Sequence, residues 1–478
     1  MKKRPILSLL AGAVLIAAAS GAWWWARAGK IQSQIAAALP PLPDAGSAPA
    51  RLRKELSDAD TDARSRFHAH AGLVKLSRLY HANGFLNEAA QCYSELEALD
   101  PTEPRWPHLH ATILAGFGEI DPAVTLWQRV VTLDPKFIPA QLRLGDCQLK
   151  SNHPDDATAT YSRVLQEDPS NSYALFGLAR LDYEAGRWDR AQQRLETVVQ
   201  QTNYTLGYDL IVTLYEKSGQ TDRARAIRAS QKASGAYRDP PDPWVDDLMD
   251  VCYDPYRLAL TAGFIARTGN PAKAVQLLQR AIELAPDDVA SRFQLGTLSI
   301  EQKNFPVARE QLERCTRLAP GFADGWAQLS GLQAQLGETS AAAATLAAGL
   351  AHCPESPGLH LMRARALQQS GSKSEAIAEF RESIRLRPNE ADAYIELANL
   401  LINLDRIDEA VHLLERSLEV EPGNPMAIST LAFHAITTGD ESSAVRWMTR
   451  VRNQPRVARE QVQQLRSAFE QQFGHPLR

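Results

Sequence analysis

Apolar residues recur at spacings of three and four through most of the chain, in paired stretches that a glycine separates. Such spacing places one apolar stripe on each of two helices. The glycine lets the chain turn between the helices, and small residues let the helices approach closely. The pattern therefore predicts helical hairpins and an all-α protein. The stretch that begins at His70 shows it with Leu76, Tyr80, Gly84, Ala89 and Tyr93.

A proline recurs at intervals of 34 residues and sets the length of the hairpin unit. Proline ends the second helix, because it lacks the N–H that a helix interior needs, and it leads into the next unit. One hairpin alone leaves its apolar face exposed, so neighbouring hairpins must stack. The prolines in this register are Pro101, Pro135 and Pro169, followed later by Pro286, Pro320, Pro354, Pro388 and Pro422.

This unit resembles the tetratricopeptide repeat, a helix-turn-helix of 34 residues with the same small, aromatic and proline positions. The resemblance covers residues 70–455 and implies an all-α solenoid of about eleven repeats, wound as a right-handed superhelix. Some positions depart from the pattern: Pro107 replaces an aromatic residue, Asn203 replaces a proline, and the fifth unit slips by one residue and carries Arg228 in place of a large apolar residue. The expected units begin at residues 70, 104, 138, 172, 205, 255, 289, 323, 357, 391 and 425.

An acidic segment, residues 239–254, interrupts the repeats and divides them into five units over 70–238 and six over 255–455. Its clustered aspartates could form a site for a cation or a basic partner. We favour a structural interpretation, because no calcium-loop spacing with a central glycine is present. Asp242-Pro243 and Asp254-Pro255 each place a capping side chain before a proline, which is typical of a helix start.

The two ends of the chain differ from the repeats. Residues 5–26 are uncharged and follow Lys2, Lys3 and Arg4, so residues 1–27 are expected to form a transmembrane anchor with a cytoplasmic amino terminus. Trp23, Trp24 and Trp25 favour retention at the lipid interface over cleavage as a secretory signal, which is the alternative. Residues 28–69 are expected to form a proline- and alanine-rich tether and a leading helix, and residues 456–478 a capping helix and tail.

Composition and charge give no sign of catalysis or nucleic-acid binding. The net charge is −4, whereas a nucleic-acid-binding domain normally carries a basic surface. The sequence has no phosphate-binding loop, nucleophile elbow or CxxC pair, so we expect no enzyme activity, cofactor or metal. The five cysteines are expected to be free thiols, and the histidine pairs His68/His70 and His108/His110 to lie on the surface or in the groove.

In tetratricopeptide repeat proteins, the first helix of each unit lines a concave groove that binds peptides or partner helices. The fifth position of each unit here holds no lysine, which argues against the clamp that some members use for a peptide carboxylate. Apolar and amide side chains instead suit a hydrophobic peptide or an amphipathic helix, unless they only pack between units. The groove candidates are Phe176, Phe293, Leu361, Ile395, Asn399 and Phe433.

These observations predict a membrane-anchored, non-catalytic scaffold or assembly factor that binds protein or peptide partners in its groove. The body is expected in the bacterial periplasm or an equivalent extracytoplasmic space, and a secreted periplasmic protein follows if the amino-terminal segment is cleaved. The alternative function is a non-catalytic, substrate-presenting subunit of an envelope enzyme complex.

Overall fold

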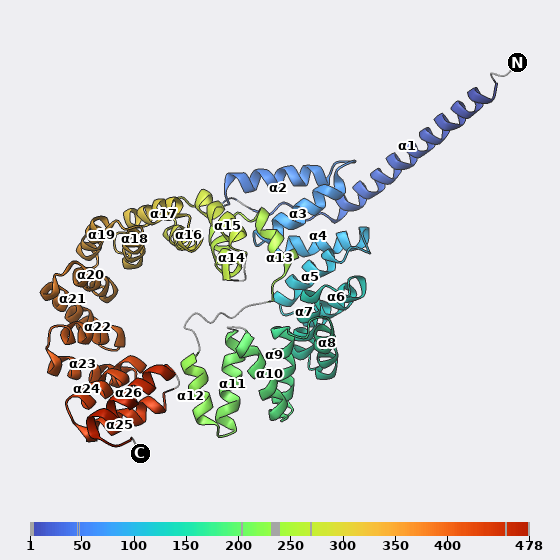
Figure 1. The fold of residues 1–478 in the computed structure, drawn as a ribbon. Helices are drawn as coiled ribbons and strands as arrows, with labels where there is room; N and C mark the ends of the chain where they lie inside the picture. The colour runs from blue at the N-terminus through green and yellow to red at the C-terminus, as the bar shows by residue number, and fades with distance from the viewer. Residues whose placement is uncertain are drawn as a thin grey trace. The chain divides into compact units, whose positions relative to one another are not determined.

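The computed structural model describes residues 4–44, 46, 48–201, 204–230, 240–267, 270–454 and 457–476, with the side chains of residues 4–19, 229 and 230 left out. These residues form 26 α-helices and one short 3-10 helix, which confirms the predicted all-α class (Figure 1). The chain divides into two compact units, residues 1–285 and 286–478. The helix pair that follows the acidic segment belongs to the first unit, and the division of the repeats at residues 239–254 stays a prediction.

The first unit holds five consecutive helix pairs, preceded by two helices and followed by the acidic segment and a sixth pair. Paired helices pack on each other and on the next pair, as expected for stacked hairpins. The helices before and within the five pairs are α1 (Arg4–Ala38), α2 (Ala50–Ala63), α3 (Ala69–Ala82), α4 (Leu86–Leu99), α5 (Arg105–Gly116), α6 (Ile120–Leu133), α7 (Ile138–Lys150), α8 (Pro154–Glu167), α9 (Ser172–Glu184), α10 (Trp188–Gln201), α11 (Thr205–Lys217) and α12 (Thr221–Ser230).

The acidic segment and the sixth pair complete the first unit. They comprise α13 (Pro243–Asp246), the 3-10 helix η1 (Asp247–Val251), α14 (Pro255–Arg267) and α15 (Pro271–Leu284). Asp242 and Asp254 accept backbone N–H bonds at the starts of α13 and α14, so the two predicted helix starts are present. The sixth pair is tied to the first, since Arg257 Nη1 donates to the Ala82 carbonyl at 2.9 Å. Figure 1 shows α13 and α14 beside α3.

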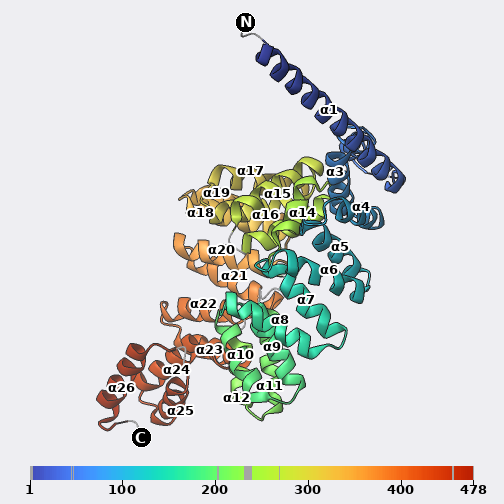
Figure 2. The same ribbon diagram turned by 90° about the vertical axis from the view of Figure 1, so that its right-hand side faces the viewer.

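The second unit contains five helix pairs and a final helix that packs on the last pair (Figure 2). Phe469 of the final helix is fully buried, which covers the apolar end of the stack. The helices are α16 (Val289–Glu301), α17 (Phe305–Leu318), α18 (Ala323–Gln335), α19 (Thr339–His352), α20 (Pro357–Ser370), α21 (Lys373–Leu386), α22 (Ala391–Ile402), α23 (Ile407–Val420), α24 (Pro425–Thr437), α25 (Glu441–Arg452) and α26 (Arg459–Phe473).

The turns inside the pairs explain the recurring glycine. Seven such turns carry a glycine at positive φ, a backbone conformation that glycine adopts without a steric penalty. Asn152, Lys303 and Asp405 occupy the same position in three other pairs, with φ near 60°. The turn geometry is therefore kept even where the glycine is lost.

The amino-terminal helix α1 continues further than the sequence pattern suggests. It runs to Ala38, so residues 28–38 are helical. Within the described part of residues 28–69, irregular chain lies at 39–44, 46, 48–49 and 64–68. Its carboxyl end packs on α3 and α4, where Ile35 is fully buried and Gln34 Nε2 donates to Glu95 Oε1 at 2.7 Å. The predicted tether from residue 28 is thus partly a docked helix, because Ile35 finds an apolar site on the repeats.

The predicted membrane span, residues 5–26, falls mostly on side chains outside the described ones. Of the helices in the described part of the chain, none is both long and apolar enough to cross a membrane.

Candidate functional site

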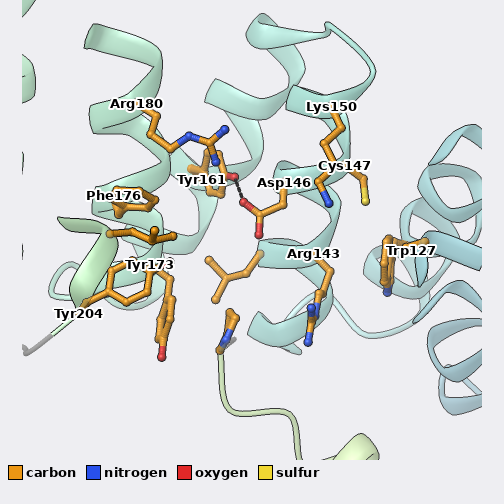
Figure 3. Close-up of a pocket in the computed structure, with 14 residues that line it drawn as sticks. Trp127, Arg143, Asp146, Cys147, Lys150, Tyr161, Tyr173, Phe176, Arg180 and Tyr204 are labelled. Atoms are coloured by element: carbon orange, nitrogen blue, oxygen red, sulfur yellow. Dashed lines mark hydrogen bonds between the residues drawn. The ribbon is translucent and has the colours of Figure 1, made fainter. Parts of the chain in front are cut away.

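The first helices of the early pairs share one surface of the first unit, which we call the first-helix face. α7 contacts α9, and α9 contacts α11, so side chains from three pairs meet there. A pocket of about 160 Å³ opens on this face (Figure 3). Pro240, at the beginning of the acidic segment, lines one side of it. The other lining residues are Ala115, Trp127, Leu142, Arg143, Asp146, Cys147, Lys150, Tyr161, Tyr173, Phe176, Arg180, Tyr204 and Leu206.

Tyr161 of α8 reaches the pocket by passing between two glycines. A Cβ placed on Gly145 would lie 2.7 Å from the Tyr161 ring, and one on Gly177 would lie 2.5 Å from it. These glycines therefore allow α7 and α9 to close on the ring from both sides. The Tyr161 hydroxyl donates a hydrogen bond of 2.6 Å to Asp146 Oδ1, which fixes the carboxylate at the back of the pocket.

Basic groups outnumber acidic groups around this carboxylate. Arg143, Lys150 and Arg180 line the pocket together with the single acid Asp146. Burial raises the pKa of the Asp146 carboxyl, although the Tyr161 hydroxyl and the three basic groups oppose the shift. The surplus of positive charge in a partly desolvated recess favours an anionic ligand group.

Aromatic rings form the opposite side of the pocket. The rings of Tyr173 and Tyr204 meet edge to face at 5.2 Å, and those of Phe176 and Tyr204 at 5.1 Å. The Arg180 guanidinium lies 5.9 Å from the centre of the Phe176 ring. The pocket thus combines an apolar side with a basic side, an arrangement suited to a protein segment that presents an acidic group next to an apolar side chain.

Nothing in the pocket is arranged as a nucleophile. Burial raises the pKa of the Cys147 thiol, so the reactive thiolate is disfavoured at neutral pH. The other four cysteines are also free thiols. Within the described ranges, no three His, Cys, Asp or Glu side chains are grouped closely enough to hold a metal ion.

Of the six predicted groove residues, only Phe176 lies in this pocket. The other five belong to the second unit. Leu361 and Ile395 are buried in one apolar cluster, and Phe293 packs edge to face on Phe322 at 5.0 Å. These three side chains therefore contribute mainly to packing between helices.

Two predicted groove residues remain accessible in the second unit. Phe433 is 53% exposed on α24, two turns from Met426, which is 52% exposed. Asn399 on α22 lies beside them, with its Nδ2 donating to the Met426 sulfur at 3.6 Å. A role for these residues in partner binding stays a prediction.

The sequence predicts His108 on the surface or in the groove, whereas the structure places it in the interior. His108 is fully buried, and its Nε2 donates to Asp242 Oδ2 at 2.8 Å. The Trp127 indole donates to His108 Nδ1 at 3.2 Å, which sets this tautomer. The acidic segment covers His108, so a groove position has become an interior one.

Sequence reasoning missed the basic residues of the pocket, because it examined only the fifth position of each unit. Arg143, Asp146 and Lys150 stand at the sixth, ninth and thirteenth positions of the unit that begins at residue 138, and Arg180 at the ninth of the next. Residues three or four apart share a helix face, so reading these positions across neighbouring units would have revealed the charge cluster.

Parts of the chain match known repeat families. Residues 153–203, 266–336 and 367–419 match one family model described as tetratricopeptide repeat, and residues 332–391 match a second with the same description.

The alignments with similar proteins span part of this chain and a smaller part of each longer relative. The chain is 27% identical over 301 residues to cellulose synthase 2 operon protein C of Komagataeibacter xylinus, which covers 62% of the chain and 20% of that relative. It is 22% identical over 246 residues to human DnaJ homolog subfamily C member 3, covering 51% of the chain and 42% of the relative. Among solved structures, yeast Tom70 aligns over 85% of the chain and 97% of its own, with 13% identity and a TM-score of 0.40.

Proposed function

We propose that this chain, which carries tetratricopeptide repeats, is a membrane-anchored, non-catalytic scaffold or assembly factor that binds partner proteins on its first-helix face. Its body would lie in the bacterial periplasm or an equivalent extracytoplasmic space. The observation that carries the proposal is the pocket of α7, α9 and α11, where basic side chains face an aromatic cluster. The partner contributes an acidic segment with an apolar side chain beside the acid.

Anchoring rests on the amino-terminal residues. Lys2, Lys3 and Arg4 precede the uncharged residues 5–26, and a basic flank of this kind is retained on the cytoplasmic side. Trp23, Trp24 and Trp25 are 55%, 67% and 58% exposed, so their rings are accessible to a lipid interface, where tryptophan is favoured. Cleavage among the small residues before Trp23 would instead release the body into the same compartment.

A second candidate is a non-catalytic subunit that presents substrate within an envelope enzyme complex. The similarity to cellulose synthase operon protein C favours it, although the chain spans only 20% of that relative. Purification from the native membrane separates the two candidates. A stoichiometric enzyme partner supports the subunit, and transient client proteins support the assembly factor.

A charge-reversal experiment tests the pocket. The probe is a fluorescein-labelled hexaglutamate peptide, and the variant is Lys150→Glu/Arg180→Glu in the full chain. We expect its affinity to fall on the order of tenfold, and wild-type binding to weaken with salt, because the attraction is electrostatic. Lys136→Glu/Arg190→Glu is the matched control, with the same charge change at exposed positions outside the pocket. Equal losses in both variants would refute a specific acidic site.

Protease access to spheroplasts tests the topology. With the anchor in place, protease added outside the inner membrane degrades the repeat body. A body that stays protected until the inner membrane is lysed contradicts the extracytoplasmic placement while leaving the hexaglutamate result unaffected.

A further inference from the structure

The acidic segment lies across the first-helix face of the first two pairs in the way that a bound peptide would. η1 packs on α3, and α13 packs on α5. Its own residues Leu248, Met249 and Cys252 are buried. Only nine of its residues are helical, in α13 and η1, and neither helix is longer than five residues. The segment therefore keeps its position mainly through contacts with the repeats.

Side chains of α3 and its turn recognise the main chain of the segment. Asn83 Nδ2 donates to the Val251 carbonyl at 2.9 Å, and the Tyr253 N–H donates to Asn83 Oδ1 at 2.7 Å. Arg78 Nη2 donates to the Asp247 carbonyl at 2.9 Å. Bonds of this type recognise the main chain and not a particular side chain, so they are available to other sequences that follow the same path.

Two side chains make the sequence-specific contacts in the amino-terminal part of the segment, in addition to the ion pair between Asp250 and Lys273 further along. Asp242 accepts the buried His108 Nε2–H, and the Trp244 indole stacks on the Phe137 ring with a centroid distance of 3.6 Å. These anchors are two residues apart, and both belong to the amino-terminal part of the segment. A competing chain thus needs an aspartate two residues before a tryptophan, followed by an acidic stretch that adopts the same short-helical path.

The segment also carries features that oppose its own docking. Partial burial, together with the negative charges of Asp242 and Asp247, raises the pKa of Asp246 to about 6, although Lys273 opposes the rise. Main-chain recognition with two side-chain anchors, combined with internal repulsion, makes exchange for a partner chain of the same chemistry feasible.

We propose that the surface formed by Arg78, Asn83, His108 and Phe137 is a peptide-binding site whose resting occupant is the chain's own residues 240–254. Its external ligand is an acidic protein segment with Asp-x-Trp anchors. The site adjoins the basic pocket, since Pro240 lines that pocket, but Arg78, Asn83, His108 and Phe137 are not among the pocket's lining residues. The proposal therefore does not depend on whether the pocket binds hexaglutamate.

The test uses the full chain and a fluorescein-labelled peptide with the sequence of residues 240–254, in which serine replaces Cys252. The variant Asp242→Ala/Trp244→Ala weakens the internal occupant. We expect this variant to bind the peptide on the order of tenfold more tightly than wild type, because the competing intramolecular contact is weakened. Adding His108→Ala or Asn83→Ala should then abolish the gain. A folded variant, judged by circular dichroism, that binds no better than wild type would overturn the proposal.

A second measurement keeps the proposal testable if that variant does not fold. Excess peptide is added to the wild-type chain, and amide hydrogen exchange of residues 244–251 is followed. Displacement predicts faster exchange with the peptide and unchanged exchange with a scrambled peptide of the same composition. Unchanged exchange at saturating peptide concentrations counts against an exchangeable occupant. Lys150→Glu/Arg180→Glu should leave both results unaltered, which distinguishes this site from the pocket.

Discussion

His108 and Asp242 are 134 positions apart in the sequence and meet at 2.8 Å between Nε2 and Oδ2, with both side chains almost fully buried. The bond joins the second repeat to the acidic segment. The Asp242 carboxylate is shielded from water, so removing its hydrogen-bond donor would leave a buried, unpaired charge and destabilise the fold.

His108→Ala should therefore destabilise the first unit by about 2–4 kcal/mol, since Asp242 would remain buried without its donor. Chemical denaturation followed by circular dichroism measures this change. His68→Ala is the matched control, because His68 is exposed, and it should leave the midpoint unchanged. Equal midpoints for the two variants would show that Asp242 finds another partner or water.

Gly177→Ala should disturb the packing of the Tyr161 ring and lower the free energy of unfolding. The added methyl would lie 2.5 Å from the ring, so the ring or α9 must move, at a cost of roughly 1–3 kcal/mol. Hexaglutamate binding should fall as well, because α9 also carries Arg180, one of the basic groups of the pocket, and a shift of the helix moves that guanidinium. Gly331→Ala is the control, since a Cβ there meets only the Met362 methyl at 4.0 Å. That variant should be neutral or more stable, as alanine is favoured over glycine within a helix.

Lys303→Gly should stabilise the second unit by about 1 kcal/mol, because Lys303 sits at a φ of 59° that glycine adopts without penalty. Thermal unfolding provides the measurement. The reverse change, Gly337→Lys at the equivalent turn of the next pair, should lower the melting temperature. A loss of stability in Lys303→Gly would mean that the lysine side chain makes a contact worth more than the backbone strain.

Asp246 should make the first unit less stable as pH rises from about 4 to about 6. Its pKa is raised to about 6 in the folded chain, so the folded state binds the proton more tightly than the unfolded state does. This contribution is present at low pH and is lost as the pH passes through 6. Asp246→Asn should remove that part of the pH dependence and raise the melting temperature at pH 7–8. Asp222→Asn, at a side chain that is 92% exposed, should change neither.

Phe433→Asp tests the predicted apolar groove of the second unit. Phe433 is 53% exposed, so the variant should fold normally, and a loss of partner cross-linking in the native membrane would support the groove. Leu361→Asp serves as the contrast. Its side chain lies in the apolar cluster, and burying a carboxylate there should unfold the unit. Unchanged cross-linking by folded Phe433→Asp would exclude this residue from the partner site.

The helix pairs could be predicted from sequence because their signals are local. Proline and glycine act on the residues beside them, and the expected units begin within one residue of the observed first helices, as at Ile138 and Pro357. The bond between His108 and Asp242 could not be predicted in this way. It forms because the segment that follows the fifth helix pair packs against the second pair. Leu361 and Phe433 both lie on first helices, so the sequence pattern treats them alike. Leu361 is nevertheless buried and Phe433 exposed, because the packing of neighbouring units differs around them.

The unbroken course of α1 has a mechanical consequence. All turns from Arg4 to Ala38, including the one that carries the buried Ile35, belong to one continuous helix. The carboxyl end of this helix is held on the first repeat by the hydrogen bond between Gln34 and Glu95. A tilt or rotation imposed on the amino-terminal turns is therefore passed to α3 and α4 instead of being absorbed by a flexible joint. The direction in which the first repeat points would then be set by whatever holds the start of the helix.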